Sequence, residues 1–217
     1  MQKNKQAFFV TGTDTDVGKT YIAAALMRHF AQQGKTVLGM KPVAAGAERV
    51  EGWLLNSDVA ELVKASNVST DLALINPYAF EPAIAPHIAA EQAGVTVSLS
   101  KIQQAFDGLQ AQADVVIVEG AGGFRVPVNR QETMADLASR LNLPVIMVVG
   151  MRLGCINHAL MTAGSIKAAG LNLVGWVANR MDPNMPALEE NIATLKAMIK
   201  APCIADVAWG EIPVFRF

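Results

Sequence analysis

Residues 12–20 read Gly-Thr-Asp-Thr-Asp-Val-Gly-Lys-Thr, and this loop constrains the fold of the chain more than any other feature. It follows the apolar run 7–10 and precedes a helical pattern, which is the order of strand, loop and helix in a phosphate-binding loop. Free backbone N–H groups at the start of such a helix point at anionic oxygens. We expect Gly18 to let the main chain approach a phosphate, Lys19 to reach the outer phosphates, and the Thr20 hydroxyl to bind Mg²⁺.

The loop is a variant of the usual pattern. Five residues separate Gly12 from Gly18, whereas the usual pattern has four, so Thr13 stands at the position of the first glycine. An ordinary polar turn between a strand and a helix is the alternative interpretation. The presence of strand, loop and helix in the required order favours the phosphate loop.

Short apolar runs typical of strands alternate with helical patterns along the chain. The strand-like runs span residues 7–10, 36–43, 115–118, 144–149, 173–178 and 203–207. The helical patterns span residues 18–33, 57–65, 99–111, 134–141, 156–169 and 187–199. Nearly all-apolar strands separated by helices predict a three-layer α/β fold of the P-loop NTPase type, with a mostly parallel sheet covered by helices on both faces. Ligands of such sheets bind beyond the carboxyl ends of the strands.

Length and composition limit the remaining possibilities. We expect residues 1–217 to form a single domain. The net charge of −1 gives no reason to expect a nucleic-acid partner, and the chain lacks the run of about 18 apolar residues that a membrane helix needs. Residues 1–6 carry no apolar signal-peptide core, so we expect a cytoplasmic protein. The segment 76–94, which contains three prolines, is predicted as a surface excursion with a short helix after Pro86.

Charged residues stand where predicted strands and helices meet. Lys41 is a single charge near the end of an apolar run, and Glu119 directly follows the run 115–118. The glycine-rich residues 120–123 behind Glu119 are expected to form a turn. At the carboxyl ends of strands, the lysine is predicted to face phosphate or a developing anion, and the glutamate to bind a metal ion. The alternatives are a surface lysine with a buried stem and a glutamate that caps a turn. Asp58 opens a helix, where acidic residues are common, so its position alone is a weak signal.

The motifs taken together resemble those of the dethiobiotin synthase family, also called dethiobiotin synthetase, from about residue 7 to about residue 209. They are residues 12–20 (GTDTDVGKT), 41–44 (KPVA), 56–58 (NSD), 76–78 (NPY), 86–87 (PH), 118–123 (VEGAGG), 154–159 (GCINHA) and 175–179 (GWVAN). The phosphate loop alone indicates only a nucleotide-binding ATPase, whereas the combination is specific.

The resemblance implies a ligase of biotin biosynthesis that uses ATP and Mg²⁺. Such an enzyme carboxylates 7,8-diaminononanoate with CO₂, phosphorylates the resulting carbamate, and closes a ureido ring. The resemblance also implies a homodimer.

The resemblance assigns roles to individual residues of this chain. The catalytic residues are Lys19 and Lys41. The implied metal ligands are Thr20, Asp58 and Glu119. Nucleotide contacts are implied for Asp16, Val17, Gly18, Lys19, Thr20, Tyr21, Asp58, Glu119, Gly120, Ala121, Gly122, Asn179, Ala208, Trp209 and Gly210. Substrate contacts are implied for Thr15, Lys41, Ala45, Cys155, Ile156 and Asn157, the last three through N–H groups at a helix start that face a carboxylate.

The chain departs from the family pattern at three places. Asp16 is one methylene shorter than the acid that many members carry, and Ala45 replaces a serine that often contacts the carbamate. The loss of that hydroxyl removes one hydrogen bond, worth about 1 kcal/mol. Residues 213–217 are not predicted to be helical, so we expect a partly open nucleotide cover, or one that a partner subunit completes.

Other functions remain as alternatives. A partitioning-type ATPase switch of related fold usually carries an extra lysine early in its phosphate loop, and residues 12–17 contain none. A cobyrinate-type amide synthase needs a glutaminase domain, for which the chain has no room. A nucleotide-binding paralogue with impaired catalysis stays open because of Ala45 and residues 213–217.

Overall fold

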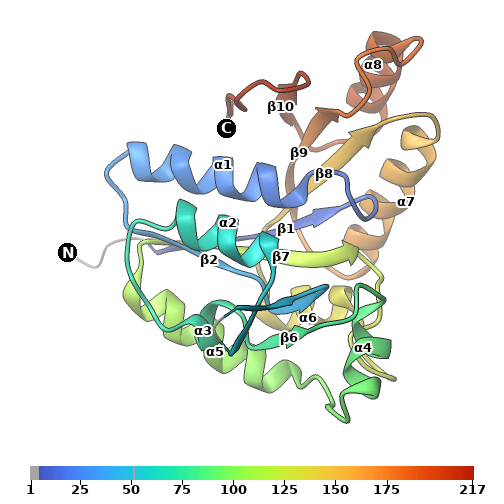
Figure 1. The fold of residues 1–217 in the computed structure, drawn as a ribbon. Helices are drawn as coiled ribbons and strands as arrows, with labels where there is room; N and C mark the ends of the chain where they lie inside the picture. The colour runs from blue at the N-terminus through green and yellow to red at the C-terminus, as the bar shows by residue number, and fades with distance from the viewer. Residues whose placement is uncertain (1–4, 51) are drawn as a thin grey trace.

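The computed structural model describes residues 5–50 and 52–217. Most of the segment 1–6, which is expected to contain no signal peptide, therefore lies outside the described residues. Its centre is a six-stranded sheet with the order β10-β9-β8-β1-β7-β2, in which every pairing is parallel (Figure 1). The strands are β1 (Gln6–Gly12), β2 (Val37–Met40), β7 (Val115–Gly123), β8 (Val145–Met151), β9 (Leu173–Arg180) and β10 (Cys203–Val207). The predicted parallel sheet is therefore confirmed.

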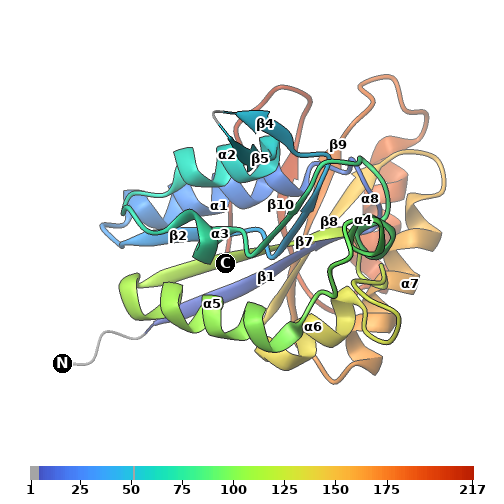
Figure 2. The same ribbon diagram turned by 60° about the horizontal axis from the view of Figure 1, so that its bottom comes forward.

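Helices cover both faces of the sheet, as predicted (Figures 1 and 2). One face carries α1 (Lys19–Gln32) and α2 (Ser57–Ala65), and the other carries α5 (Leu99–Gln112), α6 (Met134–Leu141), α7 (Cys155–Ala168) and α8 (Leu188–Met198). Side chains of β7 alternate between the two cores, because successive residues of a strand point to opposite faces. Val116 and Val118 pack into the core beneath α5 and α6, while Val115 and Ile117 pack into the core beneath α1.

The predicted strand 36–43 is wrong as a single element. β2 ends at Met40, and β3 (Val43–Ala45) forms a separate parallel pair with β6 (Tyr78–Phe80). Pro42 explains the break, because it has no N–H to give to a sheet, and the N–H of Lys41 donates to the carbonyl of Ile75 at 2.8 Å instead.

The predicted excursion 76–94 is more ordered than expected. β6 lies within it, and α3 (Leu72–Ile75) precedes it. The short helix expected after Pro86 is confirmed as α4 (Pro86–Gln92). A hairpin of β4 (Glu48–Val50) and β5 (Trp53–Leu55) was not predicted.

The glycine-rich residues expected to form a turn after residue 118 continue β7 as far as Gly123. Gly123 pairs with Gly12, the last residue of β1, across a register shift. β1 lies between β7 and β8, so the direction of chain progression across the sheet reverses at β1. The carboxyl end of β1 is therefore the topological switch point where ligands of such sheets bind. Among the described residues, no helix combines the length and the hydrophobicity that crossing a membrane requires.

Candidate active site

The phosphate loop joins β1 to α1 at the switch point, and its last residue has a backbone that only glycine tolerates well. Gly18 has φ 86°, and a Cβ added to it would lie 2.2 Å from Nδ2 of Asn179. Lys19 is the first residue of α1, and its Nζ donates to the carbonyl of Asp14 at 2.8 Å. The loop is thus folded back on itself with the Lys19 ammonium inside the turn.

Asn179 at the end of β9 holds the loop from the other side. Its Nδ2 donates to the carbonyl of Val17 at 2.9 Å. The Val17 side chain is fully buried. A Cβ added to Gly12 would lie 2.6 Å from this side chain, and a Cβ added to Gly150 would lie 2.9 Å from it. Two glycines and one amide therefore fix the position of Val17, and Asn179 has a contact with the loop that the sequence did not predict.

Three charged residues meet beside the first turn of α1. The Nζ of Lys41 donates to Oδ2 of Asp58 at 2.7 Å and to Oε1 of Glu119 at 2.6 Å, and the Thr20 hydroxyl donates to the same Glu119 oxygen at 2.7 Å. The parallel register that pairs Met40 with Val118 places Lys41 next to Glu119. We call Thr20, Lys41, Asp58 and Glu119 the charged cluster.

A side-chain cap positions Asp58 in the charged cluster. The Oδ1 atom of Asn56 accepts the N–H of Asp58 at 2.9 Å, so Asn56 caps α2. Its Nδ2 donates to the carbonyl of Ala45 at 2.9 Å. Asn56 therefore links β3, which carries the predicted substrate residue Ala45, to the acid at the start of α2.

Two charged side chains of the cluster are buried, whereas the side chain of Asp58 is 38% exposed. Lys41 is 4% exposed and Glu119 is fully buried. Burial alone would lower the pKa of Lys41, but the carboxylates of Glu119 and Asp58 outweigh burial and raise it. Burial would raise the pKa of Asp58, but the charge of Lys41 outweighs burial and lowers it. Lys41 is consequently an ammonium and Asp58 a carboxylate at neutral pH.

Lys19 lies in a different electrostatic environment from Lys41. Burial, together with the nearby positive charge of Lys41, lowers the pKa of the Lys19 ammonium to about 8. An anion beside this lysine would favour the charged form. The chemistry of the position suits a phosphate.

The charged cluster also fits a magnesium ion. The second oxygen of Glu119, Oε2, is buried and has no hydrogen-bond partner among the described residues. No group of three or more His, Cys, Asp or Glu side chains in the described part of the chain could hold a metal ion by itself. Mg²⁺ commonly binds through one or two carboxylates together with substrate phosphates and water, which is the donor set that Asp58, Glu119 and a nucleotide would supply.

The glycines that follow Glu119 keep the loop side of β7 free of side chains. At Gly122, which has φ 62°, an added Cβ would lie 2.8 Å from the Val126 side chain and 3.6 Å from the Thr15 hydroxyl. At Gly120 it would lie 3.2 Å from the Phe9 ring. The structure therefore brings the predicted residue Thr15 next to the Gly120-Ala121-Gly122 run.

The predicted base-pocket segment 208–210 lies near the start of α1. The hydroxyl of Tyr21 donates to the carbonyl of Glu211. The N–H of Glu211 in turn donates to the carbonyl of Ala208 at 3.1 Å, which closes a turn over this segment. Trp209 is 67% exposed, and Gly210 has φ 77°. Residues 213–217 are not helical, as predicted. Asp16 lies exposed in the loop with φ 55°.

The predicted substrate residues 155–157 begin α7. Among the described residues, no hydrogen bond or ion pair joins them to the charged cluster. Gly154, with φ 95°, precedes the helix, and no side chain caps its first N–H groups. Cys155 is buried with its thiol 3.8 Å from Oδ1 of Asn191, whereas Asn157 is exposed. In the part of the chain that the structure describes, no side chain thus accepts from the N–H groups at this helix start.

Two residues that the sequence did not single out connect these parts. The guanidinium of Arg152 is ion-paired with the carboxylate of Asp14, whose carbonyl accepts from Lys19. The carbonyl of Arg152 accepts the N–H of Cys155 at 3.0 Å. The phosphate loop and the start of α7 are therefore joined through one arginine. In the sequence, only the position of Arg152 just after a predicted strand could have indicated a functional role.

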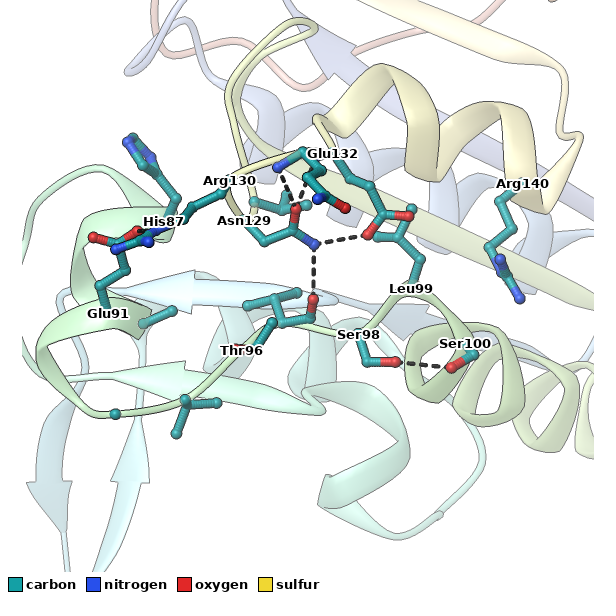
Figure 3. Close-up of a pocket in the computed structure, with 16 residues that line it drawn as sticks. His87, Glu91, Thr96, Ser98, Leu99, Ser100, Asn129, Arg130, Glu132 and Arg140 are labelled. Carbon is teal, nitrogen blue, oxygen red and sulfur yellow. Dashed lines mark hydrogen bonds and ion pairs between the residues drawn. The ribbon is translucent and has the colours of Figure 1, made fainter.

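A separate cavity of about 730 Å³ lies between α4, the start of α5, the loop after β7 and α6, and no residue of the charged cluster lines it (Figure 3). Its polar side chains largely pair with one another. Asn129 donates to the Val97 carbonyl at 2.9 Å and to Glu132 at 2.7 Å, and Arg130 donates to Glu91 at 2.8 Å. None of the predicted site residues lines this cavity.

Known proteins resemble the chain over nearly its full length. A family model described as an AAA domain matches residues 6–212. Relatives from Aromatoleum aromaticum and Nitrosospira multiformis, both named ATP-dependent dethiobiotin synthetase, are 52% and 53% identical over 202 and 206 residues. These matches cover 93% and 95% of this chain and 90% and 89% of the relatives. The chain belongs to the dethiobiotin synthetase family.

Solved structures of similar fold include members of other functional classes. The cell division protein FtsY of Thermotoga maritima has a TM-score of 0.58 at 16% identity, over 100% of this chain and 67% of its own. MinD of Pyrococcus horikoshii, whose structure is a complex with Mg-ADP, has a TM-score of 0.55 at 14% identity, over 93% of this chain and 80% of its own. At such identities the likeness concerns the fold alone, and it confirms the P-loop NTPase type. Membership in the dethiobiotin synthetase family rests on the much closer sequence relatives.

Proposed function

We propose that the chain is an ATP-dependent dethiobiotin synthetase, which joins CO₂ to 7,8-diaminononanoate and closes a ureido ring, with ADP and phosphate as the other products. The observation that carries this proposal is the contact of buried Lys41 with Glu119, also buried, and with the partly exposed Asp58, beside the first turn of the phosphate-loop helix. Phosphoryl transfer depends on positioning and charge neutralisation more than on a protein nucleophile, and the charged cluster supplies both.

Within this proposal, Lys19 and the backbone of residues 16–21 hold the phosphates of ATP. Thr20, Asp58 and Glu119 hold Mg²⁺, directly or through water. Bound Mg²⁺ neutralises negative charge on the phosphate oxygens. The partnerless Oε2 of Glu119 supports the metal assignment, because a buried carboxylate oxygen is normally satisfied.

The proposed chemistry has three steps. One amine adds to CO₂ and loses a proton, which gives a carbamate. A carbamate oxygen then attacks the γ-phosphorus of ATP, and the bond from this phosphorus to the bridging oxygen breaks. ADP is released, and the carbamate becomes a carbamic–phosphoric anhydride. The second amine attacks the carbonyl carbon, loses a proton and expels phosphate as the ring closes. Lys41 stabilises the charge on the carbamate and on the transferring phosphoryl group.

The remaining predicted residues are proposed to line the two ends of this site. Adenine contacts are proposed for Asn179, Ala208, Trp209 and Gly210, with Tyr21 holding the segment after them. Substrate contacts are proposed for Thr15, Ala45, Cys155, Ile156 and Asn157, and γ-phosphate contacts for Gly120, Ala121 and Gly122. The uncapped start of α7 supports a carboxylate there, because free N–H groups and the helix dipole both favour an anion.

We further propose a single catalytic domain over residues 1–217 that acts in the cytoplasm as a homodimer. The proposed site residues lie on the six-stranded parallel sheet and on the helices, loops and short strands that connect its strands, which supports one domain. The homodimer is proposed from the family resemblance alone.

Phosphate release measured with and without each substrate tests the proposal. We expect release to require ATP, the diamine and bicarbonate together, because the carbamate is the phosphoryl acceptor. Equal release without the diamine would favour the ATPase-switch alternative. Nucleotide binding with no release under any condition would favour the impaired paralogue.

A further inference from the structure

The ammonium of Lys41 lies at the point where the proposed metal ligands converge. Its Nζ is 2.7 Å from an oxygen of Asp58 and 2.6 Å from the Glu119 oxygen to which the Thr20 hydroxyl also donates. All three proposed metal ligands are therefore linked by hydrogen bonds around one lysine ammonium.

Charge balance gives this arrangement a consequence for metal binding. Asp58 and Glu119 together carry two negative charges, and Lys41 cancels one of them. Glu119 is fully buried and Lys41 is 4% exposed, so water screens their interaction weakly. A divalent cation that approaches without a nucleotide meets a positive charge already bound to its ligands.

We propose that Lys41 is a built-in cation that occupies the metal ligands of the free protein, and that binding of a divalent cation with nucleotide displaces its ammonium toward the reacting groups. The inference rests on the proposed function for the destination of the ammonium, but not for the competition itself. The flexible four-carbon stem of lysine permits such a change of partner.

Two observations favour exchange over a permanent structural ion pair. The buried Oε2 of Glu119 has no donor among the described residues, although Oε1 of the same carboxylate has two. A permanent pair would be expected to satisfy both oxygens. The role proposed for Lys41 also requires its ammonium to face the carbamate, and donation to both carboxylates leaves only one of its three N–H groups for that contact.

The test is the affinity of the nucleotide-free protein for Mn²⁺, a spectroscopic substitute for Mg²⁺, measured by electron paramagnetic resonance on free Mn²⁺. Lys41→Met removes the charge and keeps much of the side-chain volume, and we expect it to bind Mn²⁺ at least about tenfold more tightly than the wild type. Lys41→Arg keeps the charge and is the matched control, for which we expect no increase. Unchanged or weaker Mn²⁺ binding by Lys41→Met would overturn the inference.

A second variant guards against a failure of Lys41→Met to fold. Lys41→Gln can still donate to the carboxylates but has no charge, so the same increase in Mn²⁺ affinity is expected. Mn²⁺ should also raise the thermal midpoint of the uncharged variant more than that of the wild type, because two close carboxylates then gain a cation. Equal Mn²⁺ affinities of Lys41→Gln and the wild type would refute the proposed competition between the Lys41 ammonium and the metal ion, as would unchanged binding by Lys41→Met.

Neither measurement involves turnover, so the inference and the proposed function can fail separately. Normal diamine-dependent phosphate release by the wild type, with no gain in Mn²⁺ affinity on loss of the charge, would refute only the cation exchange. A clear gain in Mn²⁺ affinity, with no diamine-dependent release, would refute only the proposed function.

Discussion

Gly18→Ala should damage the phosphate loop by two separable effects. The residue has φ 86°, where an alanine costs about 1–2 kcal/mol. The new methyl would also lie 2.2 Å from Nδ2 of Asn179, which donates to Val17, so the amide must move and its hydrogen bond, worth about 1 kcal/mol, is lost. We therefore expect a loss of about 2–3 kcal/mol of unfolding free energy.

Gly34→Ala is the matched control for the backbone effect. Gly34 has φ 77°, and an added Cβ there meets no described atom within 4 Å, so only the cost of about 1–2 kcal/mol applies. Urea unfolding of both variants gives the difference, and titration with a fluorescent ATP analogue gives nucleotide affinity. Gly18→Ala should lose nucleotide affinity and Gly34→Ala should keep it.

Asn179→Ala in combination with Gly18→Ala isolates the steric effect. Truncation of the amide removes the atom that the new methyl would strike, so the double variant should be more stable than the sum of the single changes predicts. The reasoning would be refuted if Gly18→Ala were no less stable than Gly34→Ala and bound nucleotide normally.

Changes at four other residues test further parts of the structure. Lys41→Gln should lower kcat at least about a hundredfold with little change in nucleotide affinity. Lys19→Gln should instead weaken nucleotide binding itself. If isothermal titration showed weaker nucleotide binding for Lys41→Gln and unchanged binding for Lys19→Gln, the two assigned roles would be wrong. Arg152→Ala should weaken nucleotide binding a few-fold, since an exposed ion pair is worth about 0–1 kcal/mol, and Arg152→Lys should restore it; equal affinities of all three proteins would remove the role of Arg152. Thr133→Ala should cost about 1 kcal/mol at pH 7, because Thr133 forms a capping box with Asp136 at the start of α6. The hydrogen bond from the Thr133 hydroxyl lowers the pKa of Asp136, so the charge-dependent part of this stabilisation is present above the unfolded pKa and is lost as pH falls through the lowered folded pKa. A difference between the proteins that does not shrink as pH falls through that folded pKa would contradict this reasoning.

Local patterns in the sequence predict the centre of the site well. Lys41 and Glu119 are recognisable because each is a single charge at the end of an apolar run, and parallel strands bring such ends to one edge. In the structure Lys41 contacts both Glu119 and Asp58, although the position of Asp58 at a helix start was a weak signal by itself. The roles assigned to these residues remain proposals.

Longer-range features could not be predicted from local patterns. The Asp14–Arg152 pair joins residues 138 positions apart, and neither side chain belongs to a periodic pattern. β6 is three residues long and directly follows Pro77, so its pairing with β3 depends on the path of the chain after Pro42 and not on its own propensity. Gly120 to Gly123 were expected to form a turn, because glycine weakens strands, but pairing with β1 extends the strand through them.

The central claim is that the charged cluster directs a phosphoryl group onto a carbamate of a diamine. Its most direct test supplies ATP, 7,8-diaminononanoate and ¹³C-labelled bicarbonate to the wild-type protein and compares product mass with phosphate released. The account predicts dethiobiotin that carries one ¹³C atom, formed in equal amount to phosphate. Phosphate release without labelled dethiobiotin would contradict it.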